Sequence, residues 1–458
     1  MRSLVSFLLL CLVAAVQAVS SSGNRLLVVL ENVADKAGYS KFFGDLEGRG
    51  FEIDYETPKS EGLRLFHLGE RSYDHLLLLP TKSKGLGPNL TPNILLDFVN
   101  ADGNILVTLS GSSTVPSSLV SLLLELDIQL PSDRQGLVVD HFNYDTISAS
   151  EKHDVLVLPT PRRLRPDLSN PFAVGKDGVI AFPNGMGQTL GGGPLLAPIL
   201  RGPSTSYSYN PKEQAETVDE LFASGAQLSL ISAIQARNSA RLVVVGSVDM
   251  LSDKWFDAKV KKVGEKDSVT TLNREFAKAV SGWTFKETGV LRVNSVEHYL
   301  DEERNVTNPK IYRIKNDVTY SISLSEYSWD KYIPFEVPEN DALQLEFSML
   351  SPFHRLELKP TSSSKDSTTF SVSFKLPDQH GIFNFLVNYK RPFFTTVFEK
   401  NTVSVRHFAH DEWPRSFVIS GAWPWIAGIG ATVTGWLAFC AVWLYSAPPK
   451  TSESKKKR

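Results

Sequence analysis

One uncharged stretch near the C-terminus most constrains the fold of this chain. Residues 425–445 contain no charged side chain, and a helix of that length covers roughly 30 Å, the thickness of the hydrocarbon core of a bilayer. Aromatic residues that favour membrane interfaces mark both ends of the stretch, at Trp423 and at Tyr445. We therefore predict a single transmembrane helix over residues 423–446.

The N-terminus has the pattern of a secretory signal peptide, predicted over residues 1–18. Arg2 supplies a positive charge, and the apolar run from Leu4 to Val16 is about a dozen residues long, too short to span a bilayer. Small side chains before the junction place cleavage between Ala18 and Val19. The alternative is an uncleaved N-terminal anchor. A cleaved signal peptide would leave the large N-terminal part in the lumen of the endoplasmic reticulum (ER).

The C-terminal tail supports the same orientation. Residues 447–458, the predicted cytosolic tail, are strongly basic, whereas the segment before the transmembrane helix carries charges of both signs. Positive charge on the cytosolic side agrees with a single-pass type I membrane protein. Lys455 and Lys456 resemble the di-lysine signal that returns type I proteins to the ER; the alternative is an ordinary basic stop-transfer cluster.

Composition excludes several classes of protein. The formal net charge of the chain is −2, so nothing indicates a nucleic-acid partner. Of its two cysteines, Cys11 lies in the signal peptide and Cys440 in the transmembrane helix. The predicted luminal part therefore has no disulfide, no cysteine-based zinc site and no cysteine nucleophile.

Residues 19–286 alternate short apolar runs with helical patterns. Strands are predicted at 26–30, 51–55, 76–79 and 105–107, and helical stripes lie between them; one helix begins with Thr91 as its N-cap and Pro92 in its first turn. Further apolar strands are predicted at 155–158, 179–182, 228–233 and 242–245. Strands alternating with helices predict an α/β luminal domain with an open, mainly parallel sheet.

Residues 287–410 follow a different pattern. Apolar side chains alternate with polar ones at 318–324, 343–349, 370–376 and 383–389, and the turns between them carry Pro and Gly. A period of two without long helical stripes predicts a β-sandwich.

Few residue patterns in this chain are typical of catalysis. The glycines between Gly185 and Gly193 follow a predicted strand, but Pro194 and Pro198 interrupt the helix that a dinucleotide would need. No G-x-S-x-G or D-x-D sequence occurs, and His407 and His410 are predicted to lie at the surface. We assign no catalytic residue, no cofactor and no metal ligand.

The densest polar cluster runs from Asp140 to Asp145. The pair Asp140 and His141 fits general acid–base chemistry, and it equally fits a loop in which Asp and Asn side chains bond their own backbone. Without a nucleophile beside the pair, we favour the loop. Two sequons are candidate N-glycosylation sites, Asn89 and Asn305; Pro92 directly follows the first sequon, so Asn305 is the better acceptor.

Small residues recur every fourth position along the predicted transmembrane helix. They are Ala427, Ala431 and Gly435, which fall on one helix face and allow another helix to approach closely. This spacing indicates a partner within the membrane.

The order of these parts, together with several segments, resembles one family: the non-catalytic 48 kDa-type subunit of the ER oligosaccharyltransferase. The segments that carry the resemblance extend over nearly the whole chain: 138–145, 204–208, 235–241, 285–293, 374–378 and 403–406. The lysine-rich tail resembles the fungal branch of that family.

The resemblance implies membership of the complex that transfers a preassembled glycan from dolichyl diphosphate to the Asn of Asn-x-Ser/Thr. It implies that catalysis belongs to a many-span subunit and that the other neighbours are a ribophorin II-type and a DAD-type subunit. The α/β domain also resembles the amidotransferase-like superfamily. Two alternatives stay open: a luminal carbohydrate-binding module, and a stand-alone hydrolase that uses Asp140 and His141.

Overall fold

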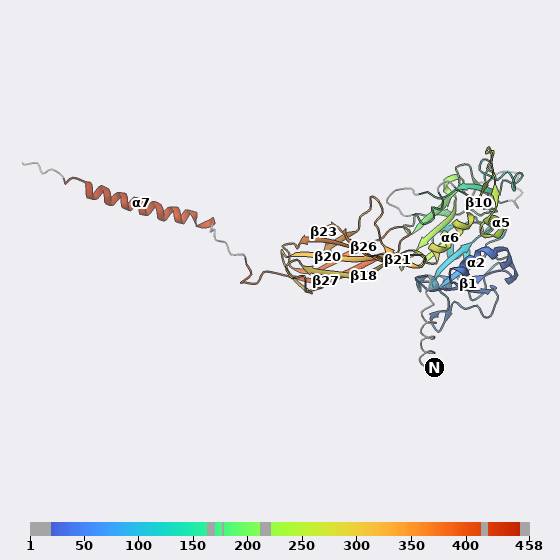
Figure 1. Cartoon of the computed structure of the whole chain (residues 1–458), viewed down its shortest axis with the longest axis horizontal. Coiled ribbons are helices and arrows are strands. Elements are labelled where there is room, and N and C mark those ends of the chain that lie inside the picture. The colour runs from blue at the N-terminus through green and yellow to red at the C-terminus, as the bar shows by residue number, and fades with distance from the viewer. Residues whose placement is uncertain (1–19, 163–169, 176–177, 211–220, 414–419, 449–458) are drawn as a thin grey trace, which may run out of the picture. The chain divides into compact units, whose positions relative to one another are not determined.

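The structure is a computed structural model that describes residues 20–162, 170–175, 178–210, 221–413 and 420–448. The chain divides into two compact units, one up to Val405 and one from Arg406 onward, and each is described by itself (Figure 1).

A seven-stranded sheet forms the centre of the N-terminal part, in the order β12-β14-β15-β6-β5-β1-β2. Five of these strands are parallel: β1 (Arg25–Val29), β2 (Glu52–Glu56), β5 (His75–Leu78), β6 (Asn104–Thr108) and β15 (Arg241–Val245). Two antiparallel strands, β14 (Ser229–Gln235) and β12 (Leu196–Arg201), complete one edge. The predicted open, mainly parallel sheet is therefore confirmed. If the five parallel strands are numbered 1 to 5 in chain order, their order across the sheet is 2-1-3-4-5, which is one of the strand orders of doubly wound folds.

Helices cover both faces of this sheet because its strands are buried on both sides. Alternate residues of β1 belong to two different cores: Leu26 and Val28 to one, Leu27 and Val29 to the other. The first core includes α2 (Ser40–Gly48) and α6 (Asn273–Thr284), and the second includes α3 (Pro92–Asn100) and α4 (Ser117–Glu125). Short turns of helix complete this part: η1 (Val33–Tyr39), η2 (Gly225–Gln227), η3 (Asp249–Leu251) and α5 (Asp253–Phe256).

The start of α3 confirms the helix boundary predicted from the sequence. The Thr91 hydroxyl accepts a hydrogen bond from the backbone N–H of Ile94 at 3.4 Å, and Pro92 is the first helical residue. A side-chain cap satisfies one of the N–H groups that a helix leaves unpaired in its first turn.

Two of the predicted apolar strands pair with each other and do not join the main sheet. They are β9 (Val155–Pro159) and β10 (Val179–Pro183), which form an antiparallel ribbon. An apolar run indicates a buried strand but does not specify which strand it pairs with. The sequence therefore predicts that these two strands exist and leaves their pairing open. Four other two-residue or three-residue ribbons surround the sheet: β3 (Phe66–His67) with β4 (Glu70–Arg71), β7 (Ile128–Gln129) with β11 (Thr189–Leu190), β8 (Leu137–Val139) with β13 (Tyr207–Tyr209), and β16 (Lys259–Val260) with β17 (Val269–Thr270).

Two antiparallel sheets follow and confirm the predicted β-sandwich. The first contains β18 (Thr288–Leu300), β20 (Asp317–Ser328), β21 (Lys331–Pro334), β24 (Lys359–Ser363) and β25 (Thr368–Lys375). The second contains β19 (Ile311–Arg313), β22 (Gln344–Ser348), β23 (Pro352–Glu357), β26 (Gly381–Tyr389) and β27 (Val397–Arg406). Aromatic rings from both sheets meet between them: Phe385 of β26 stacks on Tyr320 of β20, with ring centroids 5.5 Å apart.

The second unit contains a short turn, η4 (Ser420–Ala422), and the helix α7 (Trp423–Tyr445). This 23-residue helix is long and apolar enough to cross a membrane, and none of its apolar window is buried within the protein. The prediction of a transmembrane helix is confirmed by its length and composition.

Candidate functional site

The loop after β8 contains the polar cluster singled out in the sequence. Asp140 is completely buried, and its carboxylate accepts hydrogen bonds from the backbone N–H groups of Phe142 at 2.8 Å and Asn143 at 3.1 Å. The hydroxyl of Thr205 donates to the same carboxylate at 2.8 Å. This is the geometry of an Asx turn, in which the aspartate holds its own loop and ties it to a distant segment.

His141 lies beside Asp140 in the sequence but is not its hydrogen-bonding partner. The His141 ring is exposed; its Nε2 lies 2.9 Å from the hydroxyl of Tyr207, and its Nδ1 contacts Nδ1 of His153. All described hydrogen bonds of the Asp140 carboxylate go instead to the loop and to Thr205. The structure therefore does not bring the two side chains together as a general acid–base pair.

Replacing Asp140 with alanine should lower the free energy of unfolding by about 3 kcal/mol, because two backbone N–H groups and a hydroxyl lose their acceptor. Urea unfolding of the full-length chain in detergent, followed by circular dichroism, measures the change. The exposed Glu151→Ala is the matched control and should shift the value by less than about 0.5 kcal/mol. An Asp140→Ala chain as stable as the wild type would contradict a structural role for this carboxylate.

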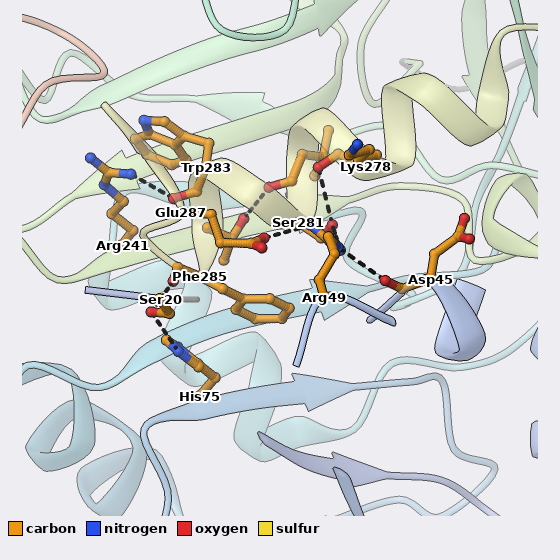
Figure 2. Close-up of polar contacts among 12 residues, drawn as sticks. Ser20, Asp45, Arg49, His75, Arg241, Lys278, Ser281, Trp283, Phe285 and Glu287 are labelled. Carbon is orange, nitrogen blue, oxygen red and sulfur yellow. Dashed lines mark hydrogen bonds and ion pairs between the residues drawn. The ribbon is translucent and has the colours of Figure 1, made fainter. Parts of the chain in front are cut away.

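A second polar cluster joins the α/β part to the sandwich around Arg241, the first residue of β15 (Figure 2). Arg241 is completely buried, and its guanidinium donates to the carbonyls of Trp283 at 2.6 Å, Thr288 at 2.7 Å and Gly289 at 2.7 Å. It also lies over the Trp283 ring, 4.7 Å from the ring centroid. One side chain therefore fixes the end of α6 and the start of β18 against the central sheet. Burial lowers the pKa of Arg241 to about 9.

The adjacent contact is an ion pair between Arg49, at the end of α2, and Glu287, which precedes β18 (Figure 2). Nη1 of Arg49 lies 2.5 Å from Oε2 of Glu287, and the Glu287 side chain is fully shielded from solvent. Arg49 also donates to the hydroxyl of Ser281 at 2.8 Å. Burial, opposed by the charge of Arg49, raises the pKa of Glu287 to about 7.

His75 occupies the other side of this cluster (Figure 2). It is fully buried, with Nε2 2.9 Å from the carbonyl of Gly23 and Nδ1 3.2 Å from the Asn104 amide. Burial lowers its pKa to about 4, so the ring is neutral at neutral pH. Nearby, the hydroxyl of Ser20 donates to the carbonyl of Phe285 at 2.6 Å, which anchors the first described residue of the chain.

The carboxyl ends of the parallel strands are where doubly wound folds bind ligands. Beyond β5 and β6 the structure has a cavity of about 10 Å³, lined in part by Thr81, Ser110 and Val115. That volume holds about one water molecule, and the buried hydroxyl of Thr81 has no partner among the described residues. This position is therefore closed to a cofactor-sized ligand.

Several of the glycines between Gly185 and Gly193 have a packing role, although Gly192 faces open space. A side chain at Gly185 would collide with the ring of Phe182, and one at Gly187 would collide with Leu228. Within the described ranges, no three His, Cys, Asp or Glu side chains gather as they would around a metal ion.

The remaining predicted sites lie apart from these clusters. Asn305 is exposed in the turn between β18 and β19, whereas Asn89 is half-buried just before the cap of α3. Ala427, Ala431 and Gly435 all lie on α7. The predicted cleavage residues Ala18 and Val19, and the tail residues Lys455 and Lys456, are outside the described residues. All of these sites stay predictions.

The fold and these clusters define a class: a protein with an α/β part and a β-sandwich joined by buried polar contacts, and with one helix, among the described residues, that is long and apolar enough to cross a membrane. Residues 17–287 match the family model of the OST48 N-terminal domain, and residues 298–447 match that of the OST48 middle domain. The chain belongs to the OST48 family.

Curated relatives match over nearly their whole length. The dolichyl-diphosphooligosaccharide–protein glycosyltransferase subunit wbp1 of Schizosaccharomyces pombe is 34% identical, covering 94% of each chain. The 48 kDa subunit of the same transferase is 36% identical in Danio rerio, over 95% of each chain, and 32% identical in Caenorhabditis elegans, over 98% of each chain. Among solved structures, a putative thua-like protein from Parabacteroides merdae covers 57% of this chain and 89% of its own, with a TM-score of 0.30 and 13% identity. A likeness at that level gives no further information about the fold.

Proposed function

We propose that this chain is a non-catalytic, assembly-stabilising subunit of an oligosaccharyltransferase complex. That complex would transfer a preassembled glycan from dolichyl diphosphate to the Asn of Asn-x-Ser/Thr in nascent proteins. The observation that carries the proposal is the match, over at least 94% of both chains, to relatives named as subunits of this transferase. The use of the Asp140 carboxylate within its own loop supports a role other than catalysis.

The proposed location is the ER membrane, with the α/β and sandwich parts in the lumen. The predicted signal peptide, with cleavage after Ala18, and α7, the candidate span found among the described residues, support this type I orientation. Lys455 and Lys456 in the cytosolic tail would serve as the retrieval signal.

The proposed partners are the catalytic many-span subunit, a ribophorin II-type subunit and a DAD-type subunit. Within the membrane, the face of α7 that carries Ala427, Ala431 and Gly435 would receive a partner helix. Small side chains let two helix backbones approach closely, and close packing is what associates helices in lipid.

Replacing Ala431 with leucine should therefore weaken association with the membrane partner by about three- to fifteen-fold. The measurement is the amount of each partner recovered with the tagged chain from detergent-solubilised membranes. Val433→Leu enlarges a side chain on another face of α7 and should leave recovery unchanged. Equal recovery with both variants would exclude this face as the contact.

The experiment that tests the function is a mild-detergent pull-down of the tagged full-length chain from ER membranes. The eluate is analysed for co-purifying proteins and assayed for transfer of a lipid-linked oligosaccharide to an Asn-x-Thr peptide. We expect a many-span protein and transfer activity to be recovered together. A chain recovered alone and inactive would refute the proposal.

A further inference from the structure

Five side-chain rings form a continuous row on the surface of the α/β part. They come from the loop after β8, the segment before β9, and β13: Tyr144, His153, His141, Tyr207 and Tyr209. Successive ring centroids are 3.8, 4.8, 5.8 and 6.1 Å apart. We call these five rings the ring row.

The ring row is accessible to solvent. His141 is exposed, and 37% of Tyr209 is exposed. Phe142, next to His141 in the sequence, has 66% of its surface exposed, whereas Asp140, two positions earlier, is completely buried. Tyr207 and Tyr209 alternate with the buried Ser208 on β13, so both tyrosines lie on the same side of the strand.

The backbone beneath the ring row is well fixed. Asp140 holds the loop that carries His141 and Phe142 by bonding two backbone N–H groups, and it bonds Thr205 close to Tyr207. The pairing of Val138 with Ser208 joins β8 to β13. Because the rings are positioned before any ligand arrives, binding would require little ordering of the protein.

The ring row also lies beyond the carboxyl ends of the parallel strands. The N–H of Val138, in β8, donates to the carbonyl of Gly185 at 2.9 Å. The N–H of Met186 donates at 2.8 Å to the carbonyl of Gly246, which directly follows β15, so β8 lies next to the carboxyl end of that strand. Doubly wound folds bind ligands outside this edge of the sheet. The cavity beyond β5 and β6 has room for about one water molecule, whereas members of the ring row are exposed at the surface.

The chemistry of the ring row matches a neutral sugar chain. Its members are phenols and imidazoles, which combine flat ring faces with hydroxyls and ring nitrogens. Tyr144 and His153 stack on each other, and Nε2 of His141 bonds the Tyr207 hydroxyl, so the ring faces open to a ligand are those of the exposed His141 and Tyr209. Asn143 and Thr205, which bond each other, are further polar groups alongside. A pyranose likewise offers an apolar C–H face for stacking and hydroxyls around its edge. The five rings include no lysine or arginine, and the carboxylates of Asp140, which bonds Asn143 and Thr205, and of Asp154, which acts on Tyr209, lie beside them. These negative charges disfavour an anionic ligand.

We propose that the ring row, with Phe142, binds a neutral oligosaccharide by stacking and hydrogen bonding. This inference rests on the proposed function for the source of that oligosaccharide, which is the glycan handled by the complex. The binding itself is a property of this chain. It therefore is testable apart from the complex.

The test is a titration of the full-length chain in detergent with mannopentaose and, separately, with chitotetraose, followed by saturation-transfer NMR and calorimetry. Phe142→Ala and Tyr209→Ala should each weaken binding of the preferred sugar by about tenfold. Tyr209→Phe keeps the ring and should retain most of the affinity. Phe398→Ala, which removes an aromatic ring that is 59% exposed on β27, is the matched control and should change nothing.

Three outcomes would overturn the inference: no binding of either sugar by the wild type, undiminished binding by both alanine variants, or an equal loss with Phe398→Ala. Thermal unfolding of each variant shows that a loss of affinity is not a loss of fold. The pull-down separates the two proposals, since a chain that assembles with the transferase but binds neither sugar refutes only the ring-row inference. Variants that lose a co-purifying subunit while keeping sugar affinity would show that Phe142 and Tyr209 contact protein instead.

Discussion

Replacing Arg241 with leucine should lower the free energy of unfolding by about 3–5 kcal/mol. The guanidinium donates to three main-chain carbonyls, and leucine would remove all three of these hydrogen bonds. The carbonyls of Trp283 and Gly289 would keep only the backbone N–H groups of Lys286 at 3.2 Å and Thr395 at 3.1 Å. The hydrogen bonds lost here come from a charged donor, so they are stronger than bonds between neutral groups, and their loss leaves the buried carbonyls less well compensated for their removal from water. Leucine would also lose the contact with the Trp283 ring.

Two further variants make this prediction specific. Arg241→Lys keeps a positive charge, but an ammonium is a compact donor and cannot reach three carbonyls with the geometry of a planar guanidinium. We expect it to recover less than half of the lost stability. Arg237→Ala removes an exposed arginine from the turn before β15 and should change stability by less than about 0.5 kcal/mol. Urea unfolding of the full-length chain in detergent measures the stability of all three variants. An Arg241→Leu chain with wild-type stability would show that the carbonyls do not need Arg241 as a donor.

The fold follows closely from local patterns in the sequence. The strand run at 26–30 is apolar on both sides because β1 is covered on both faces, and the alternation at 318–324 reflects one face of β20 turned into the sandwich. Thr91 and Pro92 mark the start of α3 by their own chemistry. Each of these signals depends on residues within a few positions of one another.

The polar clusters could not be predicted in this way. Arg241 bonds carbonyls 42 to 48 positions later in the chain, and Arg49 meets Glu287 across 238 positions. The partners of Arg241 are main-chain groups, which have no sequence signature at all. The one available signal was an arginine at the start of an otherwise apolar strand, Arg241 to Val245, since a buried charge requires partners.

The ring row shows the same limit at a candidate binding surface. The sequence singled out Asp140 and His141 because they are adjacent, but adjacency does not bring side chains together on a loop. The ring of His141 meets His153, 12 positions away, and Tyr207, 66 positions away. The pairing of β8 with β13 produces the contact with Tyr207, and the pairing of such short strands is not encoded in their length or composition.

The ion pair of Arg49 and Glu287 should give the protein a distinct dependence of stability on pH. Burial raises the folded-state pKa of Glu287 from 4.5 to about 7, although Arg49 and Lys278 oppose the shift. The folded state therefore holds a proton that the unfolded state releases between these pH values. The contribution of Glu287 to stability is full below pH 4.5 and is lost as the pH rises through 7, by about 3 kcal/mol in total.

Comparison with Glu287→Gln isolates this contribution, because glutamine resembles the protonated acid and does not titrate. We expect the stability of the variant relative to the wild type to increase as the pH rises from about 4.5 to 7, and then to level off. Other buried groups act on both proteins equally: Glu326, whose pKa burial also raises to about 7, and His75, whose lowered pKa favours the folded state as the pH rises. Glu275→Gln, which removes an exposed carboxylate from α6, controls for the loss of charge alone. Should the advantage of Glu287→Gln instead shrink as the pH rises, Arg49 would stabilise the ionised carboxylate by more than its burial costs.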